Sequence, residues 1–408
     1  MKLTTKIFIG LILGIIVGLF MQGNPDIAKT FISPIGTLFL NLIKMIIVPL
    51  VFSSLIVGAA SIGDPKSLGR IGGKTIVYYL VTTAIAVIIG LILGTVMNPG
   101  AGLQIPNTAA AAATEVPSII STLLNIIPSN PMKGIVDGNI LQIITFALFL
   151  GVGCTFLPKE KSEPFVKFFD SVAEIMYKIT ALIMELAPFG VFALIVPVVA
   201  QYGFDVLRPL SMLILAVYLG CALHAIIVYS TAVKVFAKMS PVRFFKGISP
   251  AAITAFVTTS SSGTLPITIR STKENLGVSD KIASFVLPLG ATVNMDGTAL
   301  YQGICALFIA QVYGIELSVA QMLTIILTAT LGSIGTAGVP GAGLIMLTLV
   351  LQSVGLPLEG LVLIAGIDRI LDMARTCVNV VGDASCAVIV AASEHELDLE
   401  VEKVEVII

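Results

Sequence analysis

Charged residues are scarce in this chain, and their scarcity excludes a soluble globular domain. Only 12% of the 408 residues are Asp, Glu, Lys or Arg, whereas soluble domains average about 25%. Hydrophobic residues make up 56% and the formal net charge is −1, so there is no basic excess of the kind that binds nucleic acid. The composition predicts an integral membrane protein whose surroundings are the lipid bilayer.

Cysteine and histidine lack the spacings that hold metals or form disulfide frameworks. The five cysteines stand singly in apolar segments without a C-x-x-C pair, and His224 and His395 have no ligand pattern around them. We therefore expect neither a zinc site nor disulfide bonds.

Six apolar stretches are long enough to cross a bilayer, which takes about 20 helical residues. They lie near residues 7–22, 31–60, 75–97, 119–157, 169–200 and 207–237. Four later stretches are also apolar but contain clusters of Gly, Pro, Ser, Thr and Asn, and they are residues 247–277, 280–313, 317–356 and 357–393. Lipid cannot hydrogen-bond the backbone groups that such clusters free, so we expect the clusters to face protein or a water-filled cavity.

Lys and Arg residues gather in alternate connections, which predicts that the N-terminus is cytoplasmic. Basic residues lie on both sides of residues 247–269, so this segment is expected to enter from the cytoplasm and return to it as a re-entrant hairpin. By the same count residues 317–356 enter and leave on the outside. The two units predict inverted repeats whose tips and interrupted helices meet near the midplane and form a substrate site.

Polar residues form one stripe on the last apolar stretch, namely Asp368, Asp372, Arg375, Asn379 and Asp383. At about 100° per residue they fall within about 80° of one another on a helix. Each charge at the bilayer centre costs about 2.5–3.5 kcal/mol, so the stripe needs partners, water or a ligand.

Arg375 and Asp372 are complementary handles for an acidic amino acid. A guanidinium binds a carboxylate through two parallel hydrogen bonds and keeps its charge, and Asp372 can accept an ammonium group. The alternative is that these residues, at i and i+3, form only a buried intrahelical ion pair. That alternative leaves Asp368, Asn379 and Asp383 without an explanation.

Two small-residue tips, at residues 258–264 and 333–343, offer hydroxyl and N–H groups to an anion. Between them, Asn294 and Asp296 interrupt an apolar stretch, and the unwound backbone would supply oxygen ligands suited to Na⁺. The alternatives are close helix packing at the tips and a simple kink at Asp296. In the third stretch Tyr79, Thr82 and Thr83 share one face, for which packing alone is a sufficient explanation.

Four motifs occur in a fixed order: SSSGTLP, NMDGTALYQG, GTAGVPGAG and DMARTCVNVVGD, which begin at residues 260, 294, 335 and 372. With them the chain closely resembles the glutamate/aspartate:cation symporter family, the dicarboxylate/amino acid:cation symporters. Archaeal sodium-aspartate transporters and animal excitatory amino acid transporters belong to this family. The resemblance covers essentially the whole chain and is most specific over residues 245–393.

The resemblance implies an all-α integral membrane fold of eight transmembrane helices plus two re-entrant helical hairpins, with inverted repeats, in an elevator-type transporter that forms a homotrimer. Residues 1–74 (helices 1–2) and 98–206 (helices 4–5) would form the scaffold and trimerisation part. Residues 75–97 (helix 3) and 207–393 (helix 6, hairpin 1, helix 7, hairpin 2, helix 8) would form the mobile transport domain. Residues 394–408 would be a cytoplasmic tail, in a multi-pass protein of the plasma membrane with both termini cytoplasmic.

The family's motifs also assign ligands. Arg375 would bind the side-chain carboxylate of L-aspartate or L-glutamate and Asp372 its ammonium group, with further contacts from Thr376, Asn379, Ser261, Thr298 and the tip from Val339 to Gly341. The coupling Na⁺ ions, which are not a prosthetic group, would bind three sets of oxygen ligands. These sets are Asp383 and Asn379 with carbonyls of Gly290 and Asn294; carbonyls of Thr292, Ser333, Ile334 and Thr336; and Asp296, Asn294, Tyr79, Thr82 and Thr83. Asp368 would support the site.

Two features depart from the family pattern. Relatives carry an Arg before the three serines or after the Asp aligned with Asp372, whereas this chain has Thr259 and Met373 there and places Arg369 one turn before Met373. Gln302 stands where proton- and potassium-coupled animal members carry a Glu, which favours sodium because an amide cannot take up a proton. The prediction is a sodium-coupled secondary active symporter and not an enzyme; the alternative is a proton-coupled glutamate/dicarboxylate symporter.

Two other classes compete with this interpretation. An intramembrane aspartyl protease would use Asp296 and Asp383 as a dyad that shares a proton. The many oxygen ligands and the nearby Arg375 favour ionised carboxylates instead, because a neighbouring cation lowers the pKa of an acid. A passive channel would give no uphill accumulation of substrate under an imposed ion gradient.

Overall fold

The computed structural model describes residues 3–60, 69–103, 127–137, 140–334, 338 and 341–399. Thr336 and Val339 of the predicted site lie outside these ranges. Within them the chain is helical and forms no β-strand, apart from an isolated antiparallel bridge between Val278 and Leu397. The all-α class predicted from the sequence is confirmed.

The helices of the first half are α1 (Leu3–Phe20), α2 (Pro25–Ile27), η1 (Ala28–Ile32), α3 (Ser33–Ala60), α4 (Gly69–Met97), α6 (Pro131–Val136), α7 (Ile140–Thr155), α8 (Lys159–Glu185) and α9 (Ala187–Tyr202). Those of the second half are η2 (Gly203–Val206), α10 (Leu207–Leu223), η3 (His224–Tyr229), α11 (Ser230–Phe236), α12 (Pro241–Thr258), α13 (Ser261–Glu274), α14 (Asp280–Val293), α15 (Asp296–Val312), α16 (Val319–Ser333), α17 (Ala342–Ser353), η4 (Leu358–Gly360), α18 (Leu361–Ala365) and α19 (Asp368–Ser393).

Three continuous helices in the described part of the chain are long and apolar enough to cross a bilayer, namely Arg70–Met97, Leu207–Phe236 and Asp368–Ser393. The stretch predicted over 169–200 is divided between α8 and α9 at Leu186, where Pro188 occupies the first turn of α9. Proline suits that position because its missing N–H would have no helical partner there. The number of eight spans stays a prediction.

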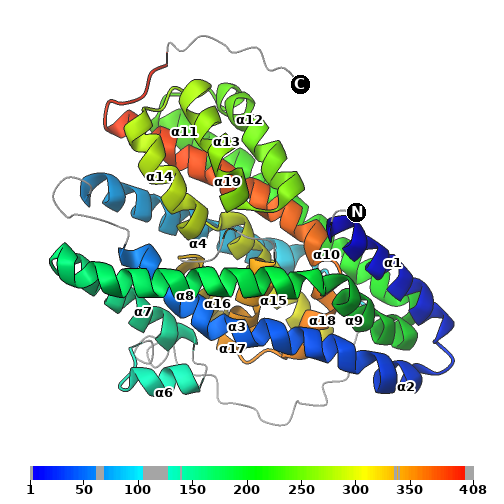
Figure 1. Cartoon of the computed structure of the whole chain (residues 1–408). Helices are drawn as coiled ribbons and strands as arrows, with labels where there is room; N and C mark the ends of the chain where they lie inside the picture. The colour runs from blue at the N-terminus through cyan, green and yellow to red at the C-terminus, as the bar shows by residue number, and fades with distance from the viewer. Residues whose placement is uncertain are drawn as a thin grey trace.

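The helices pack in two groups. In the first, α1 packs on α9, and α3 packs on α7, α8 and α9. In the second, α4 packs on α15 and α16, while α10, α12, α13, α14 and α15 pack on α19. Figure 1 shows α3 and α8 side by side in the first group, and α11–α14 gathered around one end of α19 in the second. Contacts between the groups include those of α18 with α9 and of α17 with α3 and α7.

Glycines bring α1 and α9 close together. A Cβ atom added to Gly10 would lie 2.4 Å from the carbonyl oxygen of Pro188, and one added to Gly14 would lie 2.3 Å from a methyl group of Ile195. One added to Gly18 would lie 2.7 Å from Cβ of Val199. The four-residue spacing places these glycines along one face, and small residues so spaced allow close packing between helices in membranes.

Helix α15 lies at the centre of the second group. All of its residues except Gln311 are buried, and it packs against α4, α10, α16, α17 and α19. A helix that is apolar on every side can be accommodated only where neighbours cover every side. This position explains why the residues at its N-terminal end can form an enclosed polar site.

Two helix interruptions deliver residues to that site. Helix α14 ends at Val293, Asn294 is extended (φ −95°, ψ 104°), and α15 begins at Asp296. The unwinding that the sequence predicts near Asn294 is confirmed. Between α12 and α13, Thr259 adopts a left-handed conformation (φ 54°), and the side chain of Ser260 accepts a hydrogen bond from the Gly263 N–H at 3.0 Å.

A short segment after α19, residues 394–399, connects the ends of several helices; we call it the C-terminal strap. Glu394 forms ion pairs with Arg70 and with Lys74 of α4 (2.7 Å to Lys74), and Glu396 pairs with Lys281 of α14 at 2.8 Å. The carbonyl oxygen of Leu399 accepts a hydrogen bond from Arg243 of α12 at 2.5 Å. The strap therefore contacts three helices of the second group.

Candidate functional site

Arg375 lies at the centre of a buried ionic cluster on α19. Its side chain is fully buried, with Nη1 2.8 Å from Oδ1 of Asp368 and Nη2 2.8 Å from Oδ1 of Asp372. Its Cζ atom lies 4.0 Å from the centroid of the Tyr301 ring, whose hydroxyl donates to Asp368 at 3.1 Å. The ring face and the two carboxylates compensate the charge that burial would otherwise make costly.

The sequence left open that Asp372 and Arg375 form only a buried intrahelical ion pair, and the structure contains that pair. Asp368 joins the pair as a second direct partner of Arg375, although the family resemblance gives it only a supporting role. The two terminal nitrogens of Arg375 are therefore ion-paired with two carboxylates of its own helix, while its Nε has no hydrogen-bond partner. A substrate carboxylate that binds both terminal nitrogens would replace at least one of the two aspartates there.

The predicted substrate residues that the structure describes converge beside this cluster. A small cavity is lined by Thr259, Met295, Gly338, Ala342, Gly343 and the predicted residues Ser261, Thr298, Asp372, Thr376 and Asn379. They come from α13, α15, α17, α19 and the connections between helices. The cavity volume is about 10 Å³, which is about the space that one water molecule needs. Gly341, which precedes Ala342, donates its N–H to Oδ2 of Asp372 at 3.3 Å.

The two small-residue tips touch at Gly338. Its carbonyl oxygen accepts hydrogen bonds from the Ser260 hydroxyl at 2.8 Å and from the Ser262 N–H at 3.1 Å. A Cβ atom on Gly338 would lie 2.7 Å from the carbonyl oxygen of Ala291, so only glycine fits between the first tip and the end of α14. Residues far apart in the sequence thus meet at Gly338, which lines the cavity.

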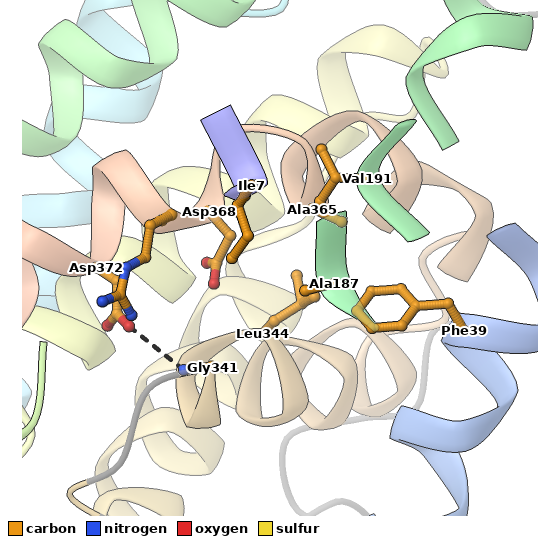
Figure 2. Close-up of a pocket in the computed structure, with 10 residues that line it drawn as sticks. Ile7, Phe39, Ala187, Val191, Gly341, Leu344, Ala365, Asp368 and Asp372 are labelled. Carbon is orange, nitrogen blue, oxygen red and sulfur yellow. Dashed lines mark hydrogen bonds between the residues drawn. The ribbon is translucent and has the colours of Figure 1, made fainter. Parts of the chain in front are cut away.

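A second cavity also borders the ionic cluster and is lined by residues of both groups of helices. Figure 2 shows Asp368 of α19 beside Ile7 of α1, with Asp372 bonded to Gly341 at one side of the view and Phe39 of α3 at the other. Its volume is about 30 Å³, and Arg369 also lines it. The charged cluster therefore borders the interface between the groups.

Asp296 is completely buried and accepts hydrogen bonds from three side chains. Its Oδ1 accepts from the Thr83 hydroxyl at 2.6 Å. Its Oδ2 accepts from the Tyr229 hydroxyl at 2.7 Å and lies 3.2 Å from Nε2 of His224. Thr83 and Asp296 belong to the same predicted set of sodium ligands, and the structure places their side chains in contact.

Asn294 connects the interruption to α19. Its Nδ2 donates to Oδ1 of Asp383 at 2.9 Å and to the carbonyl oxygen of Asn379 at 3.0 Å. Its Oδ1 is buried and has no hydrogen-bond partner. A Cβ atom on Gly290 would lie 2.4 Å from the Tyr79 hydroxyl and 2.5 Å from Oδ1 of Asp383, so these groups adjoin the Gly290 backbone. An unpaired buried oxygen among such groups is suited to a cation.

The hydroxyls of the remaining predicted sodium ligands bond within their own helices. Thr292 and Ser333 donate their hydroxyls to carbonyls three residues earlier in their own helices, at 3.0 and 2.7 Å. Ile334 is the extended residue that follows α16, and Thr82 donates to the carbonyl oxygen of Tyr79 at 3.2 Å. The grouping of Thr292, Ser333 and Ile334 as one sodium site stays a prediction.

Sequence reasoning missed His224, Tyr229 and Tyr301. His224 and Tyr229 lie at the two ends of the π-helix η3 and are its only buried residues. Their i, i+5 spacing fits neither the i+3 nor the i+4 pattern by which an α-helical face is recognised. Two polar side chains inside an apolar span were a signal, but only the π-helix explains why they face the same way.

A model of the sodium:dicarboxylate symporter family matches residues 3–393. The chain belongs to this family. It is 42% identical to the proton/sodium-glutamate symport protein of Geobacillus stearothermophilus, over 98% of this chain and 96% of that protein. It is 41% identical to the proton/glutamate-aspartate symporter of Escherichia coli (strain K12), over 97% and 94%, and 33% identical to human excitatory amino acid transporter 3, over 95% and 84%.

Family membership confirms the resemblance that the motifs indicate. A member of a symporter family is a membrane transporter rather than an enzyme, so Asp296 and Asp383 are not a protease dyad. The hydrogen bonds of these two carboxylates agree with this conclusion, since they go to separate partners on α4, η3 and the interruption at Asn294.

Proposed function

We propose that this member of the sodium:dicarboxylate symporter family is a secondary active symporter that takes up L-aspartate, L-glutamate or both, driven by a sodium gradient. It would reside in the plasma membrane with both termini in the cytoplasm, as the distribution of basic residues indicates. The names of the relatives support acidic amino acids as substrates.

The observation that carries the proposal is the charge of the buried polar core. The described residues include four buried aspartates, Asp296, Asp368, Asp372 and Asp383, and one buried arginine, Arg375. When all are ionised their formal charge is −3, and an acidic amino acid adds a further −1. Buried charge is stable only when it is paired, so an anionic substrate needs cations bound with it. Coupling to a cation gradient follows from this requirement.

Substrate recognition would be an exchange of carboxylates at Arg375. The substrate side-chain carboxylate would replace Asp372 on the guanidinium fork, and the ammonium group would bind the Asp372 carboxylate that is released. The hydroxyls of Thr298 and Thr376 and the amide of Asn379, which line the adjacent cavity, would bind the main-chain carboxylate. Such an exchange keeps the Arg375 guanidinium and the Asp372 carboxylate each paired with an opposite charge.

Access to the site would require the two tips to separate. The cavity has room for about one water molecule, and the hydrogen bonds of Ser260 and Ser262 to Gly338 close one side of it. The second tip also bonds to Asp372 through the Gly341 N–H. A substrate ammonium at Asp372 would compete with that bond, so substrate and tip position are linked.

Alternating access by an elevator movement, within a homotrimer, is the mechanism that we propose. The two groups of helices support it, since the first corresponds to the predicted scaffold and the second, with α4, to the predicted transport domain. The predicted substrate and cation residues that the structure describes lie in the second group. They can therefore move together without changing their mutual geometry.

Proton coupling of glutamate or dicarboxylate transport is the second candidate. The names of two relatives above include protons, which supports it. Gln302, which is buried with an unpartnered Oε1, favours sodium because an amide does not titrate.

Uptake of labelled L-aspartate and L-glutamate by purified protein in proteoliposomes tests the proposal, with sodium, proton and potassium gradients imposed one at a time. We expect uphill accumulation under an inward sodium gradient. Accumulation under a proton gradient alone would select the second candidate, and no accumulation under any gradient would indicate a passive channel.

A further inference from the structure

Two side chains of the π-helix η3, those of His224 and Tyr229, contact Asp296. Neither residue belongs to the predicted set of cation ligands, whereas Asp296 does. A π-helix forms i→i+5 hydrogen bonds, so residues five apart lie about one turn apart, and such segments are frequent at functional sites. His224 and Tyr229 are five apart, both fully buried, and their rings meet edge to face with centroids 4.8 Å apart. Both reach the same oxygen of Asp296.

The contacts divide the two carboxylate oxygens of Asp296 into different roles. An ionised carboxylate has about two lone-pair positions on each oxygen. Both positions on Oδ2 are taken by Tyr229 and His224, whereas Oδ1 accepts one hydrogen bond, from Thr83. One position on Oδ1 remains without a hydrogen bond. The unpaired Oδ1 of Asn294, two residues earlier, is the second oxygen near this region without a hydrogen bond.

The proton on Nε2 of His224 follows from the same geometry. An ionised carboxylate oxygen only accepts, so Nε2 of His224 carries a proton and donates it to Asp296. Nδ1 is buried without a hydrogen-bond partner, which is costly, and the contact of Nε2 with Asp296 offsets part of that cost. The Tyr229 hydroxyl is held equally tightly, since a Cβ atom on Gly382 would lie 2.4 Å from it.

We propose that His224 and Tyr229, positioned by the π-helix η3, are positioning residues of the cation site: they hold Asp296 by Oδ2 and thereby direct Oδ1 towards a sodium ion shared with Thr83 and Asn294. The inference rests on the proposed sodium symport and adds to it the residues that orient the carboxylate ligand. Their hydrogen bonds oppose rotation of the carboxylate, which would exchange its two oxygens.

Sodium-induced thermal stabilisation of the purified, substrate-free protein tests this proposal, because it measures cation binding without transport. We expect His224→Leu to raise the sodium concentration at half-effect by about 10-fold or more, which is the usual cost of removing a group that orients a ligand. His224→Gln keeps an N–H donor at a similar reach and is expected to restore a near-normal midpoint. Tyr229→Phe should raise the midpoint as well, and Ile226→Ala, at a position 62% exposed in the same π-helix, should not.

The outcomes distinguish the positioning role of His224 and Tyr229 from the sodium symport on which it rests. Equal sodium midpoints for wild type and His224→Leu would overturn the positioning role, as would a midpoint for His224→Gln as high as that for His224→Leu, since the donor would then not matter. A His224→Leu protein that melts lower without sodium but keeps the wild-type midpoint has lost packing only, and also overturns it. Wild-type protein that sodium does not stabilise at any concentration would refute the proposed sodium symport itself, and the inference with it.

Discussion

Replacing Arg375 with lysine separates the charge of this residue from the geometry of its guanidinium. Lysine keeps the positive charge between Asp368 and Asp372 but offers a single ammonium group in place of a planar fork. We expect Arg375→Lys to remain folded and to bind L-aspartate weakly. Arg375→Ala removes the charge as well and should lower both binding and stability.

The magnitudes follow from the contacts of Arg375. Its Nη1 lies 2.8 Å from Oδ1 of Asp368 and its Nη2 lies 2.8 Å from Oδ1 of Asp372. A substrate carboxylate would bind the same two terminal nitrogens. A hydrogen bond to a charged group contributes about 1.5–3 kcal/mol, so the loss of one in Arg375→Lys predicts a Kd for aspartate raised about 10- to 150-fold. Arg375→Ala leaves two buried carboxylates without their cation, and removing one partner of a buried ion pair costs about 3–5 kcal/mol.

The assay is equilibrium binding of labelled L-aspartate in saturating sodium, with thermal unfolding of the same samples. Arg369→Lys is the matched control, because Arg369 is partly exposed and its Nη2 lies 3.4 Å from the carbonyl oxygen of Thr258; we expect an effect below about 1 kcal/mol. For Arg375→Ala the ratio of affinities for aspartate and for a small neutral amino acid should fall. Unchanged aspartate binding by Arg375→Lys would refute the assignment of Arg375 to the substrate carboxylate.

Two further predictions concern stability. Hydrogen bonds from Lys74 and Arg70 lower the pKa of Glu394, so its contribution is present above the ordinary pKa of Glu, about 4.3, and is lost as the pH falls through the lowered value. The side chains of Arg70 and Lys74 are 76% and 38% exposed, so Glu394→Gln should lower the free energy of unfolding by only about 0.5–1 kcal/mol at neutral pH. In acid the melting temperature of this variant should converge with that of wild type. A constant difference between the two at all pH values would contradict this prediction. Gly10→Ala places a Cβ atom 2.4 Å from the Pro188 carbonyl oxygen and should destabilise by about 1–3 kcal/mol, whereas Gly153→Ala, with no atom within 4 Å of the added Cβ, should be neutral or slightly stabilising. Equal melting temperatures of the two alanine variants would show that α1 and α9 do not pack as closely as the glycines indicate.

The sequence was sufficient for the fold class and for the elements that carry the site. Polar residues in a hydrophobic span are costly enough to be recognised individually, so the stripe from Asp368 to Asp383 and the interruption at Asn294 were both predictable, and both are present. The break between α8 and α9 was not predicted. Hydropathy averages over a window and does not detect that Pro188 begins a new helix.

Partner choice within the site could not be predicted from one sequence. Asp368 precedes Arg375 by seven residues, which is two helical turns. The sequence does not reveal that the long Arg375 side chain spans this distance and donates a hydrogen bond to Asp368. His224 and Tyr229 reach Asp296 from another helix, through a π-helical turn that no α-helical periodicity reveals. Residues of one helix face are thus predictable from the sequence, whereas contacts between helices depend on the tertiary arrangement.

The C-terminal strap has a consequence for how the second group of helices can deform. Its residues bond to α4 through Glu394, to α14 through Glu396 and to α12 through the Leu399 carbonyl. A shift of any one of these helix ends alone would strain the ion pairs or the hydrogen bond that join the other two to the six residues of the strap. Low-energy motions at this end are therefore collective translations and rotations, and independent sliding of α12 against α14 is penalised.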